Sequence, residues 1–217
     1  MTKRLVLGFA AALALLLALP EDADAQYFAP QRPRMGARHR PHLYVGGQLM
    51  GFVVANQATN SGAEYLGPGG GGGLFGGFRF SPYFGIEGNW TVTYHNEQFA
   101  DGTTVDIDAF YVMTFTADAK IFIPTFGPLE PYFQAGVGFA YTGATYGSGY
   151  YGDEPSIWAS GPTFNVGGGV DFYVGPNISI GARLLYRGFY FTATDFPNAD
   201  PNYISGISLD ANATFHF

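Results

Sequence analysis

The stretch VDIDAFYVMTFTADAKI, residues 105–121, alternates between apolar and polar side chains with a period of two. One face is entirely apolar: Val105, Ile107, Ala109, Tyr111, Met113, Phe115, Ala117, Ala119 and Ile121. The other face is mostly polar: Asp106, Asp108, Thr114, Thr116, Asp118 and Lys120. Because successive side chains of a β-strand point to opposite faces, this pattern predicts one long strand. An unbroken apolar face of this length must lie against lipid or another sheet.

Seven further runs alternate in the same way, so the sequence predicts eight strands. They are His42 to Val54, Gly70 to Phe80, Ile86 to Tyr94, Phe133 to Tyr141, Phe164 to Phe172, Ile178 to Tyr186 and Ile207 to Phe217. The first of these is rich in glycine and ambiguous.

Connections of two lengths separate the predicted strands. Residues 81–83, 125–128 and 174–177 have the composition of tight turns, whereas 55–69, 95–103, 144–159 and 192–202 are longer and polar. Short turns on one rim and long loops on the other are typical of bacterial outer-membrane barrels, whose long loops lie outside the cell. An even number of strands places both ends of the barrel at the short-turn rim.

The composition favours a membrane wall over a soluble domain. The chain is 47% hydrophobic and 18% aromatic but only 12% charged, about half the charge of a typical soluble domain. Cysteine is absent, which excludes disulfides and thiolate metal ligands. From His42 onward the chain has fourteen acidic residues and only four basic ones, so nucleic acid is not an expected partner.

The first 41 residues contain two predicted segments, an export signal and a leader. Lys3 and Arg4 precede an apolar run from Leu5 to Leu19 and the tripeptide at 23–25, an order typical of a cleaved signal peptide over residues 1–25. The alternative, a transmembrane helix, needs about 20 apolar residues, and Pro20 ends the run earlier. Residues 26–41 form a Pro/Arg-rich periplasmic leader, either a solvated linker or a basic strip against anionic lipid. Residues 42–217 are then the barrel domain.

A closed barrel fits these strands better than the alternative, a soluble two-layer sandwich. Lipid offers no hydrogen-bond partners, so a spanning sheet must close on itself, and eight strands enclose a bore that side chains fill. Aromatic residues at strand ends predict two girdles. One contains Tyr83, Phe84, Tyr132, Phe172, Tyr173, Phe215 and Phe217, and the other Trp90, Tyr94, Tyr141, Tyr186 and Tyr190.

Charged residues share the inward face of the predicted all-β, eight-stranded, antiparallel up-and-down barrel. The predicted lumen charge network contains Arg79, Glu87, Asp106, Asp108, Asp118, Lys120, Asp171, Arg183, Arg187 and Asp210. Unpaired charge in a narrow bore is costly, so we expect ion pairs, although the sequence does not assign partners. Inward glycines leave room for these side chains: Gly136, Gly138, Gly167, Gly169 and Gly181.

Three segments resemble the small outer-membrane β-barrel family that includes the OmpA transmembrane domain, OmpX and OmpW. They are PYFQAGVGFAY at 131–141, FNVGGGVDFYVGPNISIGARLLYR at 164–187 and SLDANATFHF at 208–217. The resemblance spans nearly the whole mature chain and implies a location in the outer membrane of a Gram-negative cell. Expected partners are outer-membrane lipid and lipopolysaccharide, the barrel-assembly machinery during insertion, and an unidentified extracellular loop partner.

The same resemblance implies a role for the last strand. In that family the assembly machinery reads a terminal strand that ends in an aromatic residue, which here corresponds to Leu209, Ala213, Phe215 and Phe217. The simpler alternative is that Phe217 is only a lipid-facing girdle residue, and both roles are compatible.

The sequence offers little for catalysis, and no cofactor or metal site is expected. His95 and Glu97 fall in a predicted long loop, where a solvated pair is the simpler interpretation. Outer-membrane lipid A deacylases and palmitoyl transferases use a His and a Ser on the outer leaflet. His216 and Ser208 share a face, but His216 is next to the periplasmic end. We therefore do not expect an enzyme.

Two non-enzymatic functions remain. The leading hypothesis is a structural barrel that presents loops, such as residues 145–158, to a surface partner, because loops rich in Tyr and Gly suit adaptable contacts. The alternative is a narrow porin-like or OmpW-like conduit for small solutes. Two interpretations of the loop acids Asp101, Asp153 and Glu154 remain open: a solvated acidic loop, or a site for divalent cations that bridge lipopolysaccharide.

Overall fold

A computed structural model describes residues 40–57, 64–99, 107–146, 157–191, 193–194 and 202–217. These residues form eight long strands and one two-residue strand. The long strands are β1 (His42–Gln57), β2 (Glu64–Arg79), β3 (Phe84–Phe99), β4 (Ile107–Phe122), β5 (Leu129–Tyr146), β6 (Ile157–Tyr173), β7 (Ile178–Phe191) and β9 (Asn202–His216). The short β8 (Ala193–Thr194) pairs with β6. Within the described residues, no helix is long and apolar enough to cross a membrane.

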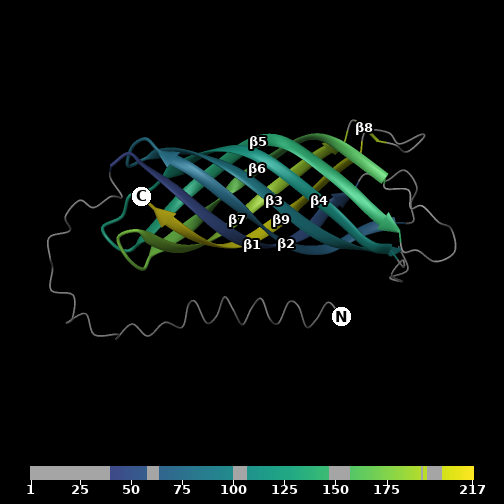
Figure 1. Cartoon of the computed structure of the whole chain (residues 1–217), viewed down its shortest axis with the longest axis horizontal. Coiled ribbons are helices and arrows are strands. Elements are labelled where there is room, and N and C mark those ends of the chain that lie inside the picture. The colour runs from purple at the N-terminus through teal and green to yellow at the C-terminus, as the bar shows by residue number, and fades with distance from the viewer. Residues whose placement is uncertain (1–39, 58–63, 100–106, 147–156, 192, 195–201) are drawn as a thin grey trace. The chain divides into compact units, whose positions relative to one another are not determined.

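The strands close into a barrel (Figure 1). Each long strand pairs antiparallel with its neighbour along the chain, and β1 also pairs with β9, which joins the first and last strands. The ladder between β1 and β9 runs from Tyr44 opposite His216 to Gln57 opposite Ile204, with one bulge near Val54. Every long strand therefore has two partners, as a bilayer demands. This closure confirms the predicted barrel and excludes the two-layer sandwich.

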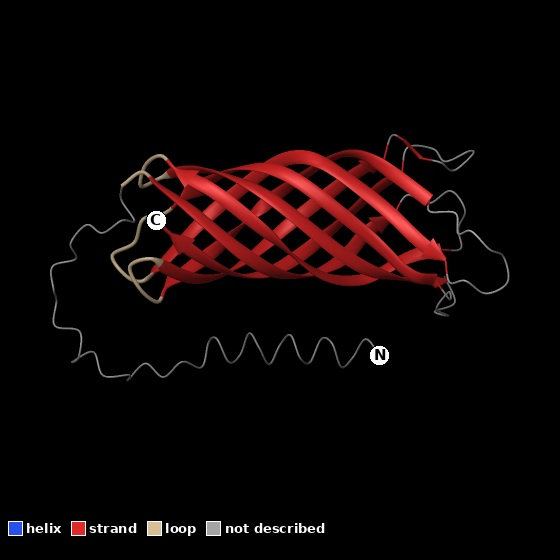
Figure 2. Ribbon diagram, in the orientation of Figure 1, coloured by secondary structure: helices blue, strands red, loops and turns tan. Residues whose placement is uncertain are grey.

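The two rims differ as predicted. Short turns connect β2 to β3, β4 to β5 and β6 to β7 at the rim that also holds the C-terminus (Figure 2). The strands reach further toward the other rim than the sequence indicated, since 55–57, 64–69, 95–99, 144–146 and 157–159 are strand rather than loop. Most of each remaining long connection, including Asp101, Asp153 and Glu154, lies outside the described residues.

The barrel wall is apolar outside and polar inside. Large apolar side chains on the outer face are exposed, with Leu49 and Val137 exposing 74% and 68% of their surface. The buried side chains are mostly polar or charged, the reverse of a soluble core. The girdle prediction was wrong for two residues, Tyr132 and Tyr173, which are buried and point into the lumen. They lie two residues from the inward-facing Gln134 and Asp171 on the same strands. The alternation along a strand therefore decides which way these side chains point, even next to the rim.

Inward glycines make space for specific side chains. A Cβ on Gly136 or Gly181 would collide with the carboxylate of Asp118 or Asp171, and one on Gly169 would lie 2.6 Å from the ring of Tyr132. On β2, a Cβ on Gly77 would meet the ring of Tyr44. At Gly136, Gly169 and Gly181 the missing side chain therefore leaves room for a larger one from another strand. A Cβ on Gly138 or Gly167 would instead meet the backbone of a neighbouring strand.

Candidate functional site: the barrel lumen

Arg183 on β7 is the centre of the lumen network. Its Nε donates to Asp210 Oδ2 on β9 at 2.9 Å, and its Nη1 donates to Glu87 Oε1 on β3 at 2.9 Å. Its Nη2 also donates to Asn89 Oδ1 at 3.1 Å. Arg183 and Asp210 expose 1% and 0% of their surface, so these charges are fully desolvated. One guanidinium thus links β3, β7 and β9 across the bore.

Two further cations extend the network. Lys120 on β4 forms an ion pair with Glu87, and its Nζ lies 4.6 Å from the centre of the Tyr132 ring. Arg187 pairs with Asp210 at 3.1 Å and donates from Nε to Ser208 at 2.9 Å. Glu87 and Asp210 therefore each form ion pairs with two cations, and these pairs offset the cost of burying the charges.

Among the described residues, Asp118 is held by amides and forms no ion pair. It accepts hydrogen bonds from Asn89 Nδ2 at 2.6 Å, Gln134 Nε2 at 2.5 Å and Asn165 Nδ2 at 2.9 Å. These donors come from β3, β5 and β6, so the carboxylate connects four strands. These hydrogen bonds satisfy the acceptor oxygens of a carboxylate that is buried in the lumen. The bore is therefore crossed by a continuous set of polar side chains.

A separate ion pair lies at the short-turn rim. Arg79 on β2 donates from Nη1 and Nη2 to Glu130 on β5 at 2.7 and 2.8 Å, a bidentate geometry. Tyr173 Oη donates to the same carboxylate at 3.0 Å. The Arg79 guanidinium also lies 4.0 Å from the centre of the Phe122 ring. All four groups are buried, so this ion pair fills one side of the barrel opening at the short-turn rim, here called the mouth.

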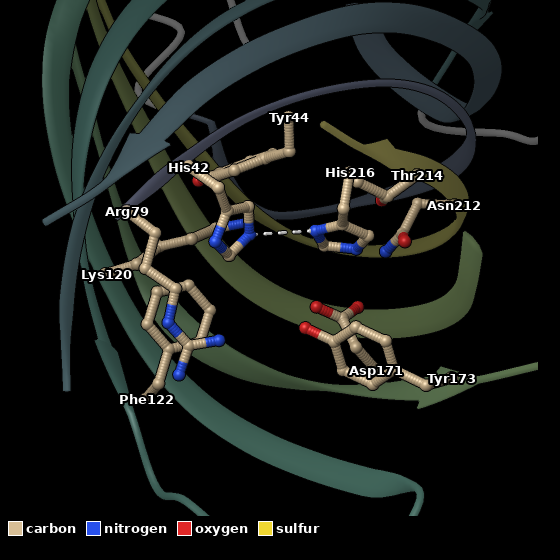
Figure 3. Close-up of a pocket in the computed structure, with 10 residues that line it drawn as sticks. All are labelled: His42, Tyr44, Arg79, Lys120, Phe122, Asp171, Tyr173, Asn212, Thr214 and His216. Carbon is tan, nitrogen blue, oxygen red and sulfur yellow. Dashed lines mark hydrogen bonds between the residues drawn. The ribbon is translucent and has the colours of Figure 1, made fainter. Parts of the chain in front are cut away.

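The other side of this mouth is formed by histidines on the first and last strands. His42 Nε2 lies 3.1 Å from His216 Nδ1, and His216 Nε2 lies 3.0 Å from Ser179 Oγ. Figure 3 shows the hydrogen bond between the two rings, with His216 above Asp171 and Tyr173 and His42 above Arg79 and Phe122. These residues line a cavity of about 10 Å³, room for one water, together with Tyr44, Arg79, Lys120, Phe122, Asn212 and Thr214.

An apolar cluster lies in the half of the lumen nearer the long loops, beside buried polar residues such as His95 and Thr142. Its core contains Phe52, Val112, Ala140, Ala159, Phe189 and Phe191, with Val54 and Ile204 packed against them. Phe52 packs edge-on against Phe189 and against His95, with ring centres 5.8 and 5.5 Å apart. The bore therefore contains charge pairs toward the short turns and, toward the long loops, an apolar cluster together with buried polar residues.

The structure gathers most of the predicted charge network into one region. Arg79, Glu87, Asp118, Lys120, Asp171, Arg183, Arg187 and Asp210 are all buried in the lumen. Asp171 has no ion pair within the described residues, and Asp106 lies outside them, as does the side chain of Asp108. The predicted assembly residues Leu209, Ala213, Phe215 and Phe217 are on the outer face, and their role stays a prediction.

Sequence reasoning missed several lumen residues. Glu130 follows the predicted turn at 125–128, and extending the parity of Gln134 back along β5 would have found it. His95 was wrongly placed in a loop: it is a buried residue of β3, within hydrogen-bond distance of Gly67 O at 3.1 Å and Thr93 Oγ1 at 3.0 Å. His216 is near Ser179 and not bonded to Ser208, which accepts from Arg187.

Comparison with known proteins agrees with this architecture. Residues 9–215 match the family described as the outer membrane protein beta-barrel domain, and the chain belongs to this family. The protein is therefore an outer-membrane β-barrel with charged residues filling its interior. Comparison with curated proteins finds no match.

Solved structures show the same fold at low identity. Neisserial surface protein A is 18% identical, with a TM-score of 0.58, over 81% of this chain and 97% of that one. OprG from Pseudomonas aeruginosa is 11% identical, with a TM-score of 0.51, over 82% and 97% of the two chains. AlkL, solved in lipid bilayers, is 14% identical, with a TM-score of 0.52, over 82% and 91%. At these identities the likeness concerns the fold.

Proposed function

We propose that this protein is a structural barrel of the outer membrane that presents its long loops to a surface partner and does not conduct solutes or catalyse a reaction. The filled bore carries this proposal. Charged side chains from β3, β4, β7 and β9 meet around Arg183, and amides from three strands converge on Asp118. A rigid and closed scaffold is suited to holding loops in place on its rim.

The proposal includes the route and the surroundings of the protein. A signal peptide over residues 1–25 would direct export into the periplasm, and the barrel-assembly machinery would read the last strand during insertion. Lipid and lipopolysaccharide would then cover the exposed apolar wall. The basic leader, residues 26–41, would remain on the periplasmic side.

A second candidate function is supported by the apolar cluster in the lumen. Phe52, Phe189 and Phe191 lie close to the long-loop rim, where a small apolar solute entering from outside would meet them. A conduit of this kind would need a path past the ion pairs, or through the wall, that the packed lumen does not show within the described residues.

Solute uptake by liposomes separates the two functions. Signal-free protein is refolded into vesicles, and folding is checked by the shift in gel mobility on heating. The structural proposal expects swelling in sugars of graded size to match that of empty vesicles, together with no added uptake of a small apolar solute. Uptake of the apolar solute alone would support the conduit, and swelling in sugars would contradict a closed bore.

A further inference from the structure

We propose that a groove on the outer wall of the barrel holds one acyl chain of a phospholipid from the periplasmic leaflet. The groove has a volume of about 640 Å³ and crosses β2, β3, β4 and β5. The residues that line it from the outer face of these strands are all apolar. The groove is continuous with the wall that meets lipid, so the proposal rests on the place of the barrel in the membrane and not on its loop-presenting role.

The floor of the groove is a row of small residues. Gly76, Gly88 and Ala117 are successive cross-strand partners on β2, β3 and β4, and Ala117 in turn lies opposite Val137 on β5. Residues that face the same side of a strand are about 7 Å apart, and four neighbouring strands span about 14 Å. A row without large side chains therefore leaves a channel about as wide as one hydrocarbon chain.

A ridge of large side chains bounds the floor on the side of the long loops. It consists of exposed cross-strand partners: Leu74, Trp90, Phe115 and Phe139. The rings of Trp90 and Phe115 are stacked, with centres 6.5 Å apart and an angle of 30° between their planes. Inside a bilayer the hydrophobic effect does not favour protein over lipid, so van der Waals packing decides what is held. A chain in the groove contacts protein atoms on two sides, the floor and the ridge.

Packing within the protein does not require the two glycines of the floor. Apart from its chain neighbours, the atom nearest to a Cβ on Gly88 would be Gly76 O at 3.9 Å. The atom nearest to a Cβ on Gly76 would be Val45 Cγ1 at 3.6 Å, which is ordinary contact. By contrast, a Cβ on the inward Gly136 would collide with Asp118. The space above the floor is therefore open to an occupant from outside the chain, and the membrane supplies acyl chains there.

The groove runs obliquely from the short-turn rim toward the middle of the wall. Gly76 lies three residues from Arg79, where β2 ends, whereas Val137 lies eight residues from Leu129, where β5 begins. The short turns of outer-membrane barrels face the periplasm. The end of the groove at β2 is therefore in the periplasmic leaflet, and a chain that enters there follows the floor toward the middle of the bilayer.

Native mass spectrometry of the refolded signal-free protein tests the proposal. The protein is refolded in vesicles of phosphatidylethanolamine and phosphatidylglycerol, extracted into a mild detergent and checked for folding by gel mobility. We expect one phospholipid to be retained per chain, and Gly88→Leu, which fills the floor, to reduce the retained fraction by about fivefold or more. Gly51→Leu is the matched control, because Gly51 is exposed on β1, outside the groove, and a Cβ there meets nothing within 4 Å. It should stay within about twofold of the unchanged protein.

Tryptophan fluorescence gives a second measurement, with the floor left intact. Trp158→Phe leaves Trp90, on the ridge, as the only tryptophan of the chain. A phosphatidylcholine brominated in the middle of one acyl chain should quench Trp90 in vesicles. Part of this quenching should persist after transfer into excess detergent, because the chain in the groove stays bound while the surrounding lipid is removed.

Three results of mass spectrometry would overturn the proposal. They are the absence of a retained phospholipid, equal retention in Gly88→Leu and the unchanged protein, and a loss in Gly51→Leu as large as that in Gly88→Leu. A dimer that Gly88→Leu abolishes would also overturn it, since the groove would then hold a second copy of the chain. Should Gly88→Leu fail to fold, the fluorescence of Trp90 decides, and its full recovery in detergent contradicts the proposal.

Discussion

At the scale of single residues, the lumen depends on small groups that make room for charged ones. Asp118 accepts three amide hydrogen bonds, and the inward face of Gly136 leaves the space in which its carboxylate lies. Arg183 donates to four acceptors, on Asp210, Glu87, Asn89 and Gln134. Each of these sites should therefore be sensitive to the addition or loss of a few atoms.

Gly136→Ala tests the space around Asp118. The added methyl would collide with the carboxylate and lie 2.9 Å from Ala117 O, so we expect the free energy of unfolding to fall by about 1–3 kcal/mol. Urea unfolding in lipid vesicles, followed by tryptophan fluorescence, measures the change. Gly51→Ala is the matched control, because a Cβ there meets nothing within 4 Å. Equal effects of the two substitutions would mean that Gly136 does not make room for Asp118.

Arg183→Met tests the central ion pairs. Glu87 and Asp210 each lose one of two cations and stay paired with Lys120 and Arg187, but each loses a buried, charged hydrogen bond to Arg183. Because a hydrogen bond to a charged group contributes about 1.5–3 kcal/mol, we expect a loss of about 3–5 kcal/mol in the free energy of unfolding, measured in the same way. Asp171→Asn is the control within the lumen, since Asp171 has no ion pair among the described residues, and it should change stability by less than about 1 kcal/mol. A small effect of Arg183→Met would contradict a network centred on this residue.

The sequence predicted which residues face the bore better than it predicted how they pair. Alternation alone placed Arg183, Lys120 and Asp118 inside, because parity along a strand is a local property. It did not reveal that Asp118 is bound by amides, since partners on four strands depend on the register between strands. His42 was missed because the glycine-rich first run shows weak alternation, and Glu130 because it directly follows a predicted turn.

At the scale of elements, each strand separates a lipid face from a lumen face. The outer face of β5 carries Phe133, Val137 and Phe139, all largely exposed, while Gln134 on its inner face exposes only 3%. Such a strand is stable only where the apolar face meets lipid. The strands were predicted shorter than they are, because polar residues near the long-loop rim, such as those at 95–99, resemble loop by composition although they continue the ladder.

An arginine on the outer face of β5 should cost stability according to its depth. Val137 lies near the middle of the strand and Leu129 begins it. We expect Val137→Arg to reduce the free energy of unfolding by about 2–4 kcal/mol and Leu129→Arg by about 0–1 kcal/mol, as found for charges across barrel walls. Urea unfolding in vesicles measures both. Equal costs at the two positions would argue against a lipid-facing wall.

At the scale of the whole molecule, two kinds of filling close one barrel. The ring of strands is completed by β1 and β9, so the wall has no free edge among its eight long strands. Inside, ion pairs and amides occupy the half toward the short turns, and an apolar cluster with buried polar residues such as His95 and Thr142 occupies the half toward the long loops. The eight-stranded barrel and its charged interior were predictable from period-two alternation, but the division of the lumen into two halves was not, because it depends on how tilted strands bring distant residues to one height.

The central claim is that the network around Arg183 closes the bore. Single-channel conductance in a planar bilayer tests it most directly, with folding of each protein confirmed by gel mobility. The account predicts that the unchanged protein is silent and that Arg183→Ala, which removes the side chain linking Glu87 to Asp210, produces discrete openings. Equal conductance of the two proteins, whether both open or both silent, would contradict it.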